Sequence, residues 1–457
     1  MTPKTLFRIT LLVSVLLLSS LACGVCGLEA FLPRSVPSEV VEVPREEPTV
    51  SLPTITPIPP KMPRTVTLRA DGSGDYPTLQ SAVADLMAGS TITLEAGEFP
   101  ITAPLEVNYS LTIRGQGMDS TIITGNTGPT MLKFTGPGSL VLENLAFSYR
   151  GSDHANILDV SDAELMVSNC RFSGAVRDLE QKTGGSGLVV RSASSGTIIS
   201  STFEDNMLHG VNIQDNGNFL VSDSQFINSG QSGLLFSDDA IGEVRNCSSQ
   251  YNGYHGFSTM ERSNVLFENN LSFNNLENGF FAMDDSLMTA RSNQSYYNGL
   301  HGFSIKDKAS VILEDNMAYD NVEAGIRITD FAFLDAMRND VSGNGLSGII
   351  TLGESMSKLS YNTVYGNGEG GIRVGSNAYV EAIYNTVYGN ALSGFIGVEN
   401  GYLVAENNTS RDNLQSGFSF FDYSSGKLVA NTCSGNTNKG ISIHDSANPT
   451  IGTNNCP

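Results

Sequence analysis

Acidic side chains recur every 23 residues along the second half of the chain. The members of this acidic column are Asp215, Asp238, Glu261, Asp284, Asp307, Asp330, Glu399, Asp422 and Asp445. On adjacent layers of one structure, neighbouring carboxylates would stand about 4.8 Å apart and repel one another. Ca²⁺ takes several carboxylate oxygens and would offset that repulsion. We therefore expect weak Ca²⁺ binding around Asp284, Asp307 and Asp330, with a solvated acidic turn as the alternative.

Basic and imidazole side chains fall near the middle of this column. Lys306 and Arg327 are predicted to point outward on adjacent layers, and Arg373 lies two layers further on. His301 precedes them, at a position that also holds His209 and His255. We expect His301, Lys306, Arg327 and Arg373 to lie near the acidic column, with ordinary surface charges as the alternative.

Apolar side chains occupy other positions that are predicted to face outward. They are Leu235, Met260, Phe281, Met283, Ile350, Leu352, Ile396, Val398 and Phe421. Contiguous exposed apolar surface marks a binding site. Phe281, Met283 and Phe421 are the candidates for substrate binding, since aromatic rings stack on sugar faces, whereas the aliphatic members suit a protein partner.

A strict repeat must position all of these side chains. Glycine stands at 187, 210, 233, 256, 279, 302, 325, 348, 371, 394, 417 and 440. Each interval is 23 residues, and a fixed short period of this kind is typical of a solenoid.

The pattern within the repeat predicts strands. Counting each glycine as position 0, position +1 is always large and apolar, and position +3 is mostly apolar. Alternation with a spacing of two is typical of a strand. Two further apolar segments lie near positions +9 to +11 and +16. The predicted fold is all-β, a single-stranded right-handed parallel β-helix with three short strands per coil and about fifteen coils.

Asparagine fills two columns of the repeat. Position +14 is Asn at 270, 293, 316, 339, 362, 385, 408, 431 and 454, and position +19 is Asn in ten coils from Asn206 to Asn436. Asn tolerates left-handed backbone and bonds locally, so we predict that these residues form the corners. Their amides are also expected to bond from coil to coil, as in other in-register ladders.

Composition limits the partners. The chain has 457 residues, no Trp, and 47 acids against 26 bases, for a formal charge of −21. Phosphate binding needs clustered Lys and Arg, so the balance disfavours nucleic acid and anionic membrane surfaces. It allows cations or glycans as partners.

The N-terminus predicts export. Residues 1–22 read as a signal peptide, with Lys4 and Arg8 before the apolar run Ile9–Leu18. A small residue precedes Cys23, which predicts lipidation of Cys23; ordinary cleavage and an uncleaved anchor are the alternatives. Residues 23–63 form a Pro-rich tether. We expect an extracellular, membrane-anchored monomer at the cell surface.

The β-helix is predicted to span residues 64–457, with irregular coils at 64–186 and regular repeats at 187–457. Its first part includes a capping helix over Leu79–Met87, with Thr78 as N-cap. The polar segment Ser173–Ser186 breaks the period and should loop outward, either as a plain surface loop or as a wall of a binding face.

Two motifs carry a family resemblance. The run Asp71–Thr78, the following helix and the segment Leu111–Gly115 resemble the opening of pectin-methylesterase-type β-helices. The later repeats resemble the pectin-lyase-like superfamily. Pectate-lyase-like enzymes combine Ca²⁺-binding Asp with an Arg or Lys base beside a uronate carboxylate. The resemblance therefore implies candidate catalytic residues at His301, Lys306, Arg327 and Arg373, near Asp284, Asp307 and Asp330. The catalytic motifs of pectin methylesterases, polygalacturonases and alginate epimerases are missing, which lowers the expectation of catalysis.

The cysteines divide by position. Cys433 and Cys456 are 23 residues apart in the same inward column, so they are predicted to stack within disulfide reach, with two buried thiols as the alternative. Cys170 and Cys247 look like lone core residues, and no metal-ligand spacing appears.

The sequence therefore favours an exported, lipid-anchored surface protein that binds polysaccharide without catalysis. One alternative is a polysaccharide lyase or hydrolase acting on an acidic glycan. Another is a structural scaffold that binds a second protein. No cofactor is certain, and Ca²⁺ is the one candidate.

Overall fold

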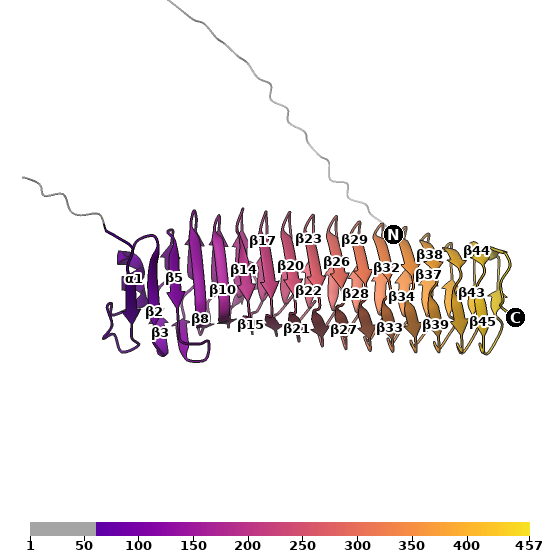
Figure 1. The fold of residues 1–457 in the computed structure, drawn as a ribbon, viewed down its shortest axis with the longest axis horizontal. Coiled ribbons are helices and arrows are strands. Elements are labelled where there is room, and N and C mark those ends of the chain that lie inside the picture. The colour runs from indigo at the N-terminus through magenta and orange to yellow at the C-terminus, as the bar shows by residue number, and fades with distance from the viewer. Residues whose placement is uncertain (1–60) are drawn as a thin grey trace, which may run out of the picture. The chain divides into compact units, whose positions relative to one another are not determined.

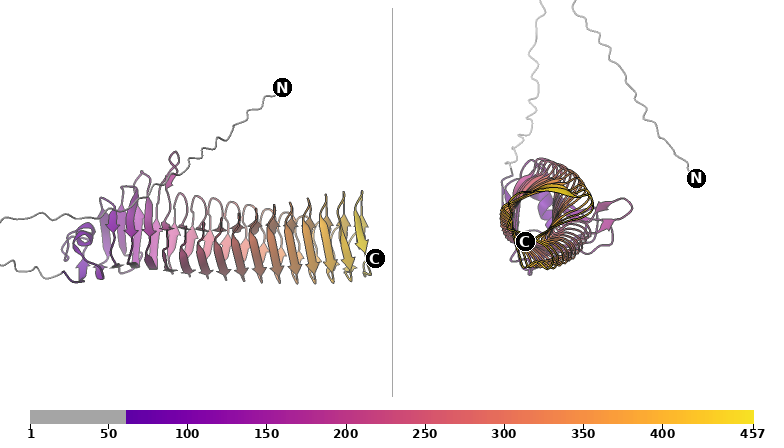
Figure 2. Two further views of the ribbon diagram at one scale, coloured as in Figure 1. Left: turned by 90° about the horizontal axis from the view of Figure 1, so that it is seen from above. Right: turned by 90° about the vertical axis from the view of Figure 1, so that its right-hand side faces the viewer.

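The computed structural model describes residues 61–457, which wind into a parallel β-solenoid (Figure 1). The predicted signal peptide, the lipidated Cys23 and nearly all of the predicted tether lie outside the described residues. Each regular coil contributes three short strands to two long parallel sheets, so the predicted fold class is confirmed. Viewed along its axis, the solenoid is a stack of nearly superimposed coils (Figure 2).

One sheet has 15 strands and takes one strand from each coil; it is called the groove sheet below. Its strands are β4 (Leu105–Val107), β7 (Thr130–Thr135), β9 (Asn156–Ser161), β13 (Leu188–Arg191), β16 (Val211–Ile213), β19 (Leu234–Phe236), β22 (Phe257–Thr259), β25 (Phe280–Ala282), β28 (Phe303–Ile305), β31 (Ile326–Ile328), β34 (Ile349–Thr351), β37 (Ile372–Val374), β40 (Phe395–Gly397), β43 (Phe418–Phe420) and β46 (Ile441–Ile443).

The other sheet has 30 strands and takes the remaining two strands of each regular coil. They are β1 (Thr65–Leu68), β2 (Ser90–Leu94), β3 (Gly97–Ile101), β5 (Leu111–Arg114), β6 (Thr121–Gly125), β8 (Ser139–Tyr149), β10 (Glu164–Ser173), β14 (Ser195–Ile199), β15 (Thr202–Glu204), β17 (Asn218–Ser222), β18 (Gln225–Ile227), β20 (Ile241–Arg245), β21 (Ser248–Gln250), β23 (Asn264–Glu268), β24 (Leu271–Phe273), β26 (Leu287–Arg291), β27 (Gln294–Tyr296), β29 (Ser310–Glu314), β30 (Met317–Tyr319), β32 (Phe333–Met337), β33 (Asp340–Ser342), β35 (Met356–Ser360), β36 (Thr363–Tyr365), β38 (Tyr379–Ile383), β39 (Thr386–Tyr388), β41 (Tyr402–Glu406), β42 (Thr409–Arg411), β44 (Ser425–Val429), β45 (Thr432–Ser434) and β47 (Asn448–Ile451).

A short helix lies at the N-terminal end of the described solenoid, at the indigo end of Figure 1. The helix α1 spans Leu79–Asp85, and the hydroxyl of Thr78 accepts a hydrogen bond from the Ser81 backbone N–H at 3.1 Å. Leu79 and Val83 are buried against the first coils. The predicted helix and its cap are confirmed, although the helix ends at Asp85 rather than Met87.

The core is built from columns of identical phase. Phe257, Phe280 and Phe303 pair directly with one another across β22, β25 and β28, and each is at most 1% exposed. Their rings stack at centroid distances of 5.1 and 4.8 Å. Each repeated glycine lies where the backbone is closely approached: a Cβ on Gly279 would overlap the Ser295 side chain. The prediction that side chains at position +1 face the core is confirmed.

The asparagine columns are buried ladders. In the +14 column, the side-chain oxygen of Asn339 accepts from the backbone N–H of Asn316 at 2.9 Å and from its side-chain amide at 3.0 Å. The amide of Asn339 in turn donates to the Leu313 carbonyl and to Asn362, both at 2.9 Å. The predicted ladder is therefore present.

The predicted left-handed backbone at these asparagines is wrong. The residue immediately before the asparagine has positive φ instead, as Asp315 does with φ 56° and Arg338 with φ 56°. The asparagine itself must turn its amide inward to close the ladder, so the preceding residue makes the bend.

The segment after β10 leaves the solenoid, as predicted. It forms an antiparallel hairpin, β11 (Arg177–Asp178) and β12 (Thr183–Gly184), which projects from the side of the coil stack (Figure 2).

The cysteines lie inside the solenoid, as their positions in the sequence predicted. Cys433 and Cys456 are joined by a disulfide between the last two coils, with 4.4 Å between their Cα atoms. Cys170 and Cys247 are buried thiols, and burial raises the pKa of each to about 12. Among residues 61–457, no helix is long and apolar enough to span a bilayer.

Replacing one ladder amide should weaken the fold. In Asn339→Ala, the backbone N–H of Asn316 and the carbonyl of Leu313 each lose a buried partner. We expect the free energy of unfolding to fall by about 3 kcal/mol, because each unsatisfied buried group costs ~1–3 kcal/mol. Urea denaturation measures it. The control is Asn264→Ala, at an exposed position on β23, which should stay within about 0.5 kcal/mol of wild type. Equal stability of the two variants would contradict the role of the ladder.

Candidate functional site

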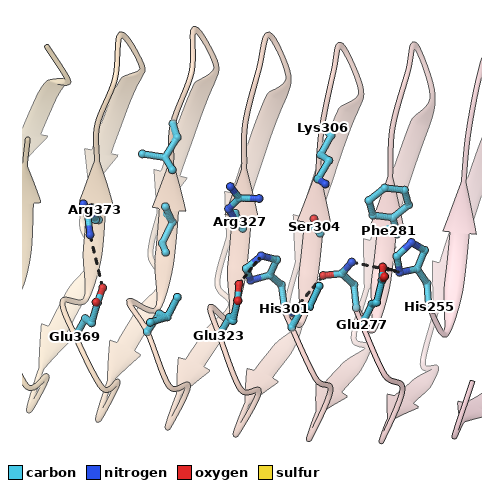
Figure 3. Close-up of a pocket in the computed structure, with 15 residues that line it drawn as sticks. His255, Glu277, Phe281, His301, Ser304, Lys306, Glu323, Arg327, Glu369 and Arg373 are labelled. Atoms are coloured by element: carbon cyan, nitrogen blue, oxygen red, sulfur yellow. Dashed lines mark hydrogen bonds and ion pairs between the residues drawn. The ribbon is translucent and has the colours of Figure 1, made fainter. Parts of the chain in front are cut away.

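A set of chemically capable side chains on the outer face of the groove sheet lies over β25, β28, β31, β34 and β37 (Figure 3). They surround an open cavity of about 460 Å³, called the central groove below. Its lining is His255, Glu277, Asn278, Phe281, Leu300, His301, Ser304, Lys306, Glu323, Arg327, Leu346, Ile350, Leu352, Glu369 and Arg373. The structure thus brings together His301, Lys306, Arg327 and Arg373, which the sequence analysis selected.

The imidazole of His301 contacts the carboxylate of Glu323 and holds it in position. Its Nδ1 accepts a hydrogen bond from the backbone N–H of Ala324 at 3.2 Å, so the ring proton lies on Nε2. Nε2 faces a carboxylate oxygen of Glu323 at 3.2 Å. Burial, with Arg327 and Lys306 close by, lowers the pKa of His301 to about 3. The imidazole is therefore neutral with both nitrogens engaged, so it positions Glu323 and is not available as a general base.

His255, two coils earlier, also lies beside a glutamate, but both of its contacts are made at Nδ1. The amide of Asn278 donates to Nδ1 of His255 at 3.2 Å, while its oxygen accepts from the backbone N–H of His301 at 3.2 Å (Figure 3). A carboxylate oxygen of Glu277 lies 3.5 Å from the same imidazole. Burial and the charge of Lys306 lower the pKa of His255 to about 3. The histidines and Asn278 therefore link successive coils beneath the groove.

The three cations differ in their partners. Arg373 lies 3.7 Å from Glu369, whose other contact is the Ser347 hydroxyl at 3.3 Å. Lys306 and Arg327 form no ion pair with any acid in residues 61–457. The buried hydroxyl of Ser304, in the coil between those of Phe281 and Arg327, also has no hydrogen-bond partner there. The central part of the groove thus presents polar groups that a ligand can satisfy.

Side chains of the same type recur every two coils in the central groove, whereas they recur in every coil in the core. Glu277, Glu323 and Glu369 are spaced by 46 residues, and Leu300 and Leu346 occupy the same position in the coils between them. Arg327 and Arg373 are also 46 residues apart. The sequence analysis missed the three glutamates. The 46-residue spacing was the signal that would have revealed them.

The prediction that Phe281 is an exposed stacking surface is wrong. Its ring is 6% exposed, because the His255 ring stacks on it at 4.1 Å and the Lys306 ammonium lies 5.7 Å from its centroid. Met283 is partly buried and does not line the groove. Phe421 stacks on His444 at 4.6 Å in a separate cavity near the C-terminus. Phe281 and Phe421 therefore lie in two different cavities, and substrate binding by these three residues stays a prediction.

The acidic column lies at a tight turn. Asp284, Asp307 and Asp330 have φ between 56 and 65°, so each makes a left-handed bend. Carboxylates of this column accept hydrogen bonds from the preceding coil: the backbone N–H of Glu261 donates to Asp284 at 3.2 Å, and that of Asp307 donates to Asp330 at 3.4 Å. No group of three or more His, Cys, Asp or Glu in residues 61–457 is arranged to hold a metal ion. Ca²⁺ binding at these residues stays a prediction.

The groove combines two chemistries. On one side, the carboxylates of Glu277, Glu323 and Glu369 are acceptors for hydroxyl groups. Lys306 and Arg327 are donors for carboxylates, and Arg327 can bind one through two parallel hydrogen bonds. Three acids and three bases give the lining a formal charge of zero, in a chain whose charge is −21. The groove is therefore far less repulsive to an anion than the rest of the surface.

Comparison with known proteins agrees with the fold. The family model described as "Right handed beta helix region" matches residues 186–335 and 334–456, which is more than half of the chain. No curated protein sequence matches the chain.

Solved structures that resemble the chain include the A-module of a mannuronan C-5 epimerase from Azotobacter vinelandii, with 16% identity over 82% of this chain and 94% of that one and a TM-score of 0.37. Others are pectate lyase Pel9A, at 13% identity over 64% and 76% with a TM-score of 0.36, and an α-1,3-glucanase catalytic unit from Streptomyces thermodiastaticus, at 13% over 85% and 69% with a TM-score of 0.43.

The buried imidazoles should make stability depend on pH. The pKa of His301 is about 3 in the fold, against about 6.5 in an unfolded chain, so the unfolded state takes up protons first as the pH falls. The contribution is complete above pH ~6.5 and is lost as the pH falls toward 3. In His301→Asn, the loss of unfolding free energy between pH 7 and pH 5 should be smaller by about 2 kcal/mol than in wild type.

Urea denaturation at both pH values measures this difference. Asn278 occupies the same position of its coil, so the fold accepts asparagine there. An unchanged pH dependence in His301→Asn would show that the imidazole is not held neutral.

Proposed function

This chain belongs to the right-handed β-helix family, and we propose that it binds a linear, carboxylate-bearing polysaccharide in the central groove without acting on it chemically. The observation that carries the proposal is that Lys306 and Arg327 line the groove without an ion-pair partner among the described residues. They lie on adjacent coils, face one groove, and have no acidic partner within residues 61–457. Two such cations are complementary to carboxylates of a ligand.

The form of the groove favours a polymer. It runs along the solenoid axis over five strands of the groove sheet, and its charged positions recur every two coils, or about 9.6 Å. A compact ligand would use one set of these positions, whereas an extended chain of sugars meets them repeatedly. The hydroxyls of the sugars would donate to Glu277, Glu323 and Glu369, while their carboxylates meet the cations.

Catalysis on the same glycan is the second candidate, and one observation favours it. Glu323 is fixed by His301, and Glu277 projects into the groove two coils away. Two coils correspond to about 9.6 Å, close to the ~6.5–9.5 Å between the carboxyl groups of inverting glycosidases. A lyase reaction would instead need a base near Arg327 to remove the proton beside a uronate carboxylate.

Binding of acidic glycans should depend on Arg327. We expect the full chain to bind oligouronates and not neutral oligosaccharides of the same length, as measured by titration calorimetry. In Arg327→Gln, the lost bidentate contact should weaken binding by about tenfold or more. Lys427→Gln, which removes an exposed lysine on β44 in the other sheet, should leave binding unchanged.

The outcomes separate the candidates. Equal affinity for neutral and acidic glycans, or no binding of either, would overturn the proposal. Chains cleaved by hydrolysis, with cleavage lost in Glu323→Gln, would establish a glycosidase instead. Unsaturated uronate ends, lost in Arg327→Gln, would establish a lyase.

We also propose that the protein is exported and anchored through a lipid on Cys23, with the Pro-rich residues 23–63 as its tether. The support is the sequence pattern of residues 1–23. In a bacterial host that exports the full chain, Cys23→Ser should move the protein from the membrane fraction to the soluble fraction, while Cys26→Ser should not. Identical fractionation of both variants would argue against the anchor.

A further inference from the structure

A second cavity lies on the same face of the groove sheet, beside the hairpin β11–β12. Its volume is about 490 Å³, and it is called the hairpin cavity below. The residues that matter in its lining are Lys133 on β7, His154 before β9, Asp159 on β9, Lys182 on the hairpin, Arg191 on β13 and Asn212 on β16. The cavity lies at the junction of the irregular and regular coils, where the chain departs from its repeat.

The hairpin is a fixed wall. At its base, the backbone N–H of Ala155 donates to the Val176 carbonyl at 2.8 Å, and the N–H of Val176 donates back to Ala155 at 3.2 Å. Gly185 closes the other side by donating to the Ala155 carbonyl at 3.0 Å. At the tip, the carboxylate of Asp178 accepts from two backbone N–H groups at 2.8 and 2.9 Å. These bonds hold Lys182 at the cavity.

The charges of the hairpin cavity are not balanced internally. Arg191 is used within the protein, since its Nε lies 3.4 Å from Asp159 and it donates to Gln214 at 2.9 Å. Lys133 and Lys182 are exposed and form no ion pair with any acid in the part of the chain that the structure describes. Two ammonium groups that line one cavity, from β7 and from the hairpin, are complementary to an anion.

The floor of the cavity identifies a second feature of the ligand. Asn212 is 9% exposed, and its side-chain oxygen is buried without a hydrogen-bond donor. A buried acceptor without a donor costs about 1–3 kcal/mol, which a hydroxyl of a ligand would recover. A ligand with both a carboxylate and hydroxyl groups satisfies the lysines and Asn212 together, and a sugar acid has both.

We propose that the hairpin cavity is a second binding site for a sugar acid, and that one glycan chain occupies this cavity and the central groove together. Lys133 and Lys182 face the carboxylate, and Asn212 accepts from a hydroxyl. The second half of the proposal rests on the function proposed above for the central groove.

The geometry of the sheet supports one chain in both sites. The strands run without interruption from β9 through β13, β16, β19 and β22 to β25, so the two sites share one face. β25 lies five coils after β9, which corresponds to about 24 Å along the solenoid axis. Sites linked by one ligand can raise the apparent affinity by about 10²–10⁴ over either site alone.

Calorimetry on the full chain tests both halves of the proposal. The probes are a short oligouronate that fits one cavity and a polyuronate long enough to span both. Two short oligomers should bind per wild-type chain, and one per chain in the double variant Lys133→Gln/Lys182→Gln. The polyuronate should bind more tightly than the short oligomer, and the double variant should weaken it by about tenfold or more.

Two further variants make the test specific. Asn212→Leu keeps the branched shape of the side chain and removes the acceptor, so it should weaken binding of the short oligomer at the hairpin cavity only. Lys427→Gln is the matched lysine control and should change nothing. Circular dichroism melting curves verify that each variant is folded.

The possible results separate this inference from the proposed function. One short oligomer per wild-type chain, lost in Arg327→Gln and unaffected by the lysine variant, would overturn the hairpin site and leave the central groove standing. Binding that is lost only in the lysine variant would do the reverse. A polyuronate that binds no more tightly than the short oligomer would overturn the single-chain arrangement, and no uronate binding at all would overturn both proposals.

Discussion

The stacking of each coil directly on the one before it is the constraint on which the rest of this structure depends. Aromatic rings in one column, such as Phe280 and Phe303, are 4.8 Å apart, which is the spacing of neighbouring strands. The buried asparagine ladders hold this register, because each amide satisfies a backbone group and an amide of the neighbouring coil. A slip of one residue would leave a row of buried amides without partners. Register is therefore fixed by hydrogen bonding as well as by the apolar core.

The same constraint shapes the chemistry outside. A charged column with one member per coil places like charges about 4.8 Å apart. The acidic column tolerates this spacing, since carboxylates such as Asp284 and Asp330 accept backbone N–H groups. The groove glutamates take no backbone hydrogen bond of this kind within the described residues, and they alternate with Leu300 and Leu346, which doubles their separation. The surface available to a ligand thus has a longer period than the core.

Much of the fold could be predicted because the position of a residue within the 23-residue repeat indicates whether it faces the core, a corner or the solvent. The glycine column, the inward phenylalanines and the capping by Thr78 were all legible in the sequence. The left-handed corners were assigned to the asparagines and belong to the residues before them, such as Arg338, because the sequence does not show which of two neighbours makes the bend. At the site, the position within the repeat predicted that Lys306 and Arg327 face outward on adjacent coils. It could not predict that Phe281 is covered, because that depends on how long side chains from two other coils fold over it.

The sequence by itself determined the architecture, the stacking of Cys433 on Cys456 and the outward columns of charge, because a period of 23 residues assigns one direction to every position. Only the tertiary structure decided which charges have partners. It showed that His301 contacts Glu323, that Lys306 and Arg327 have no acidic partner within the described residues, and that the hairpin brings Lys182 to the cavity that Lys133 lines. These outcomes depend on hydrogen bonds and burial between residues of different coils, and such contacts follow from the packing of side chains in space rather than from their order in the chain.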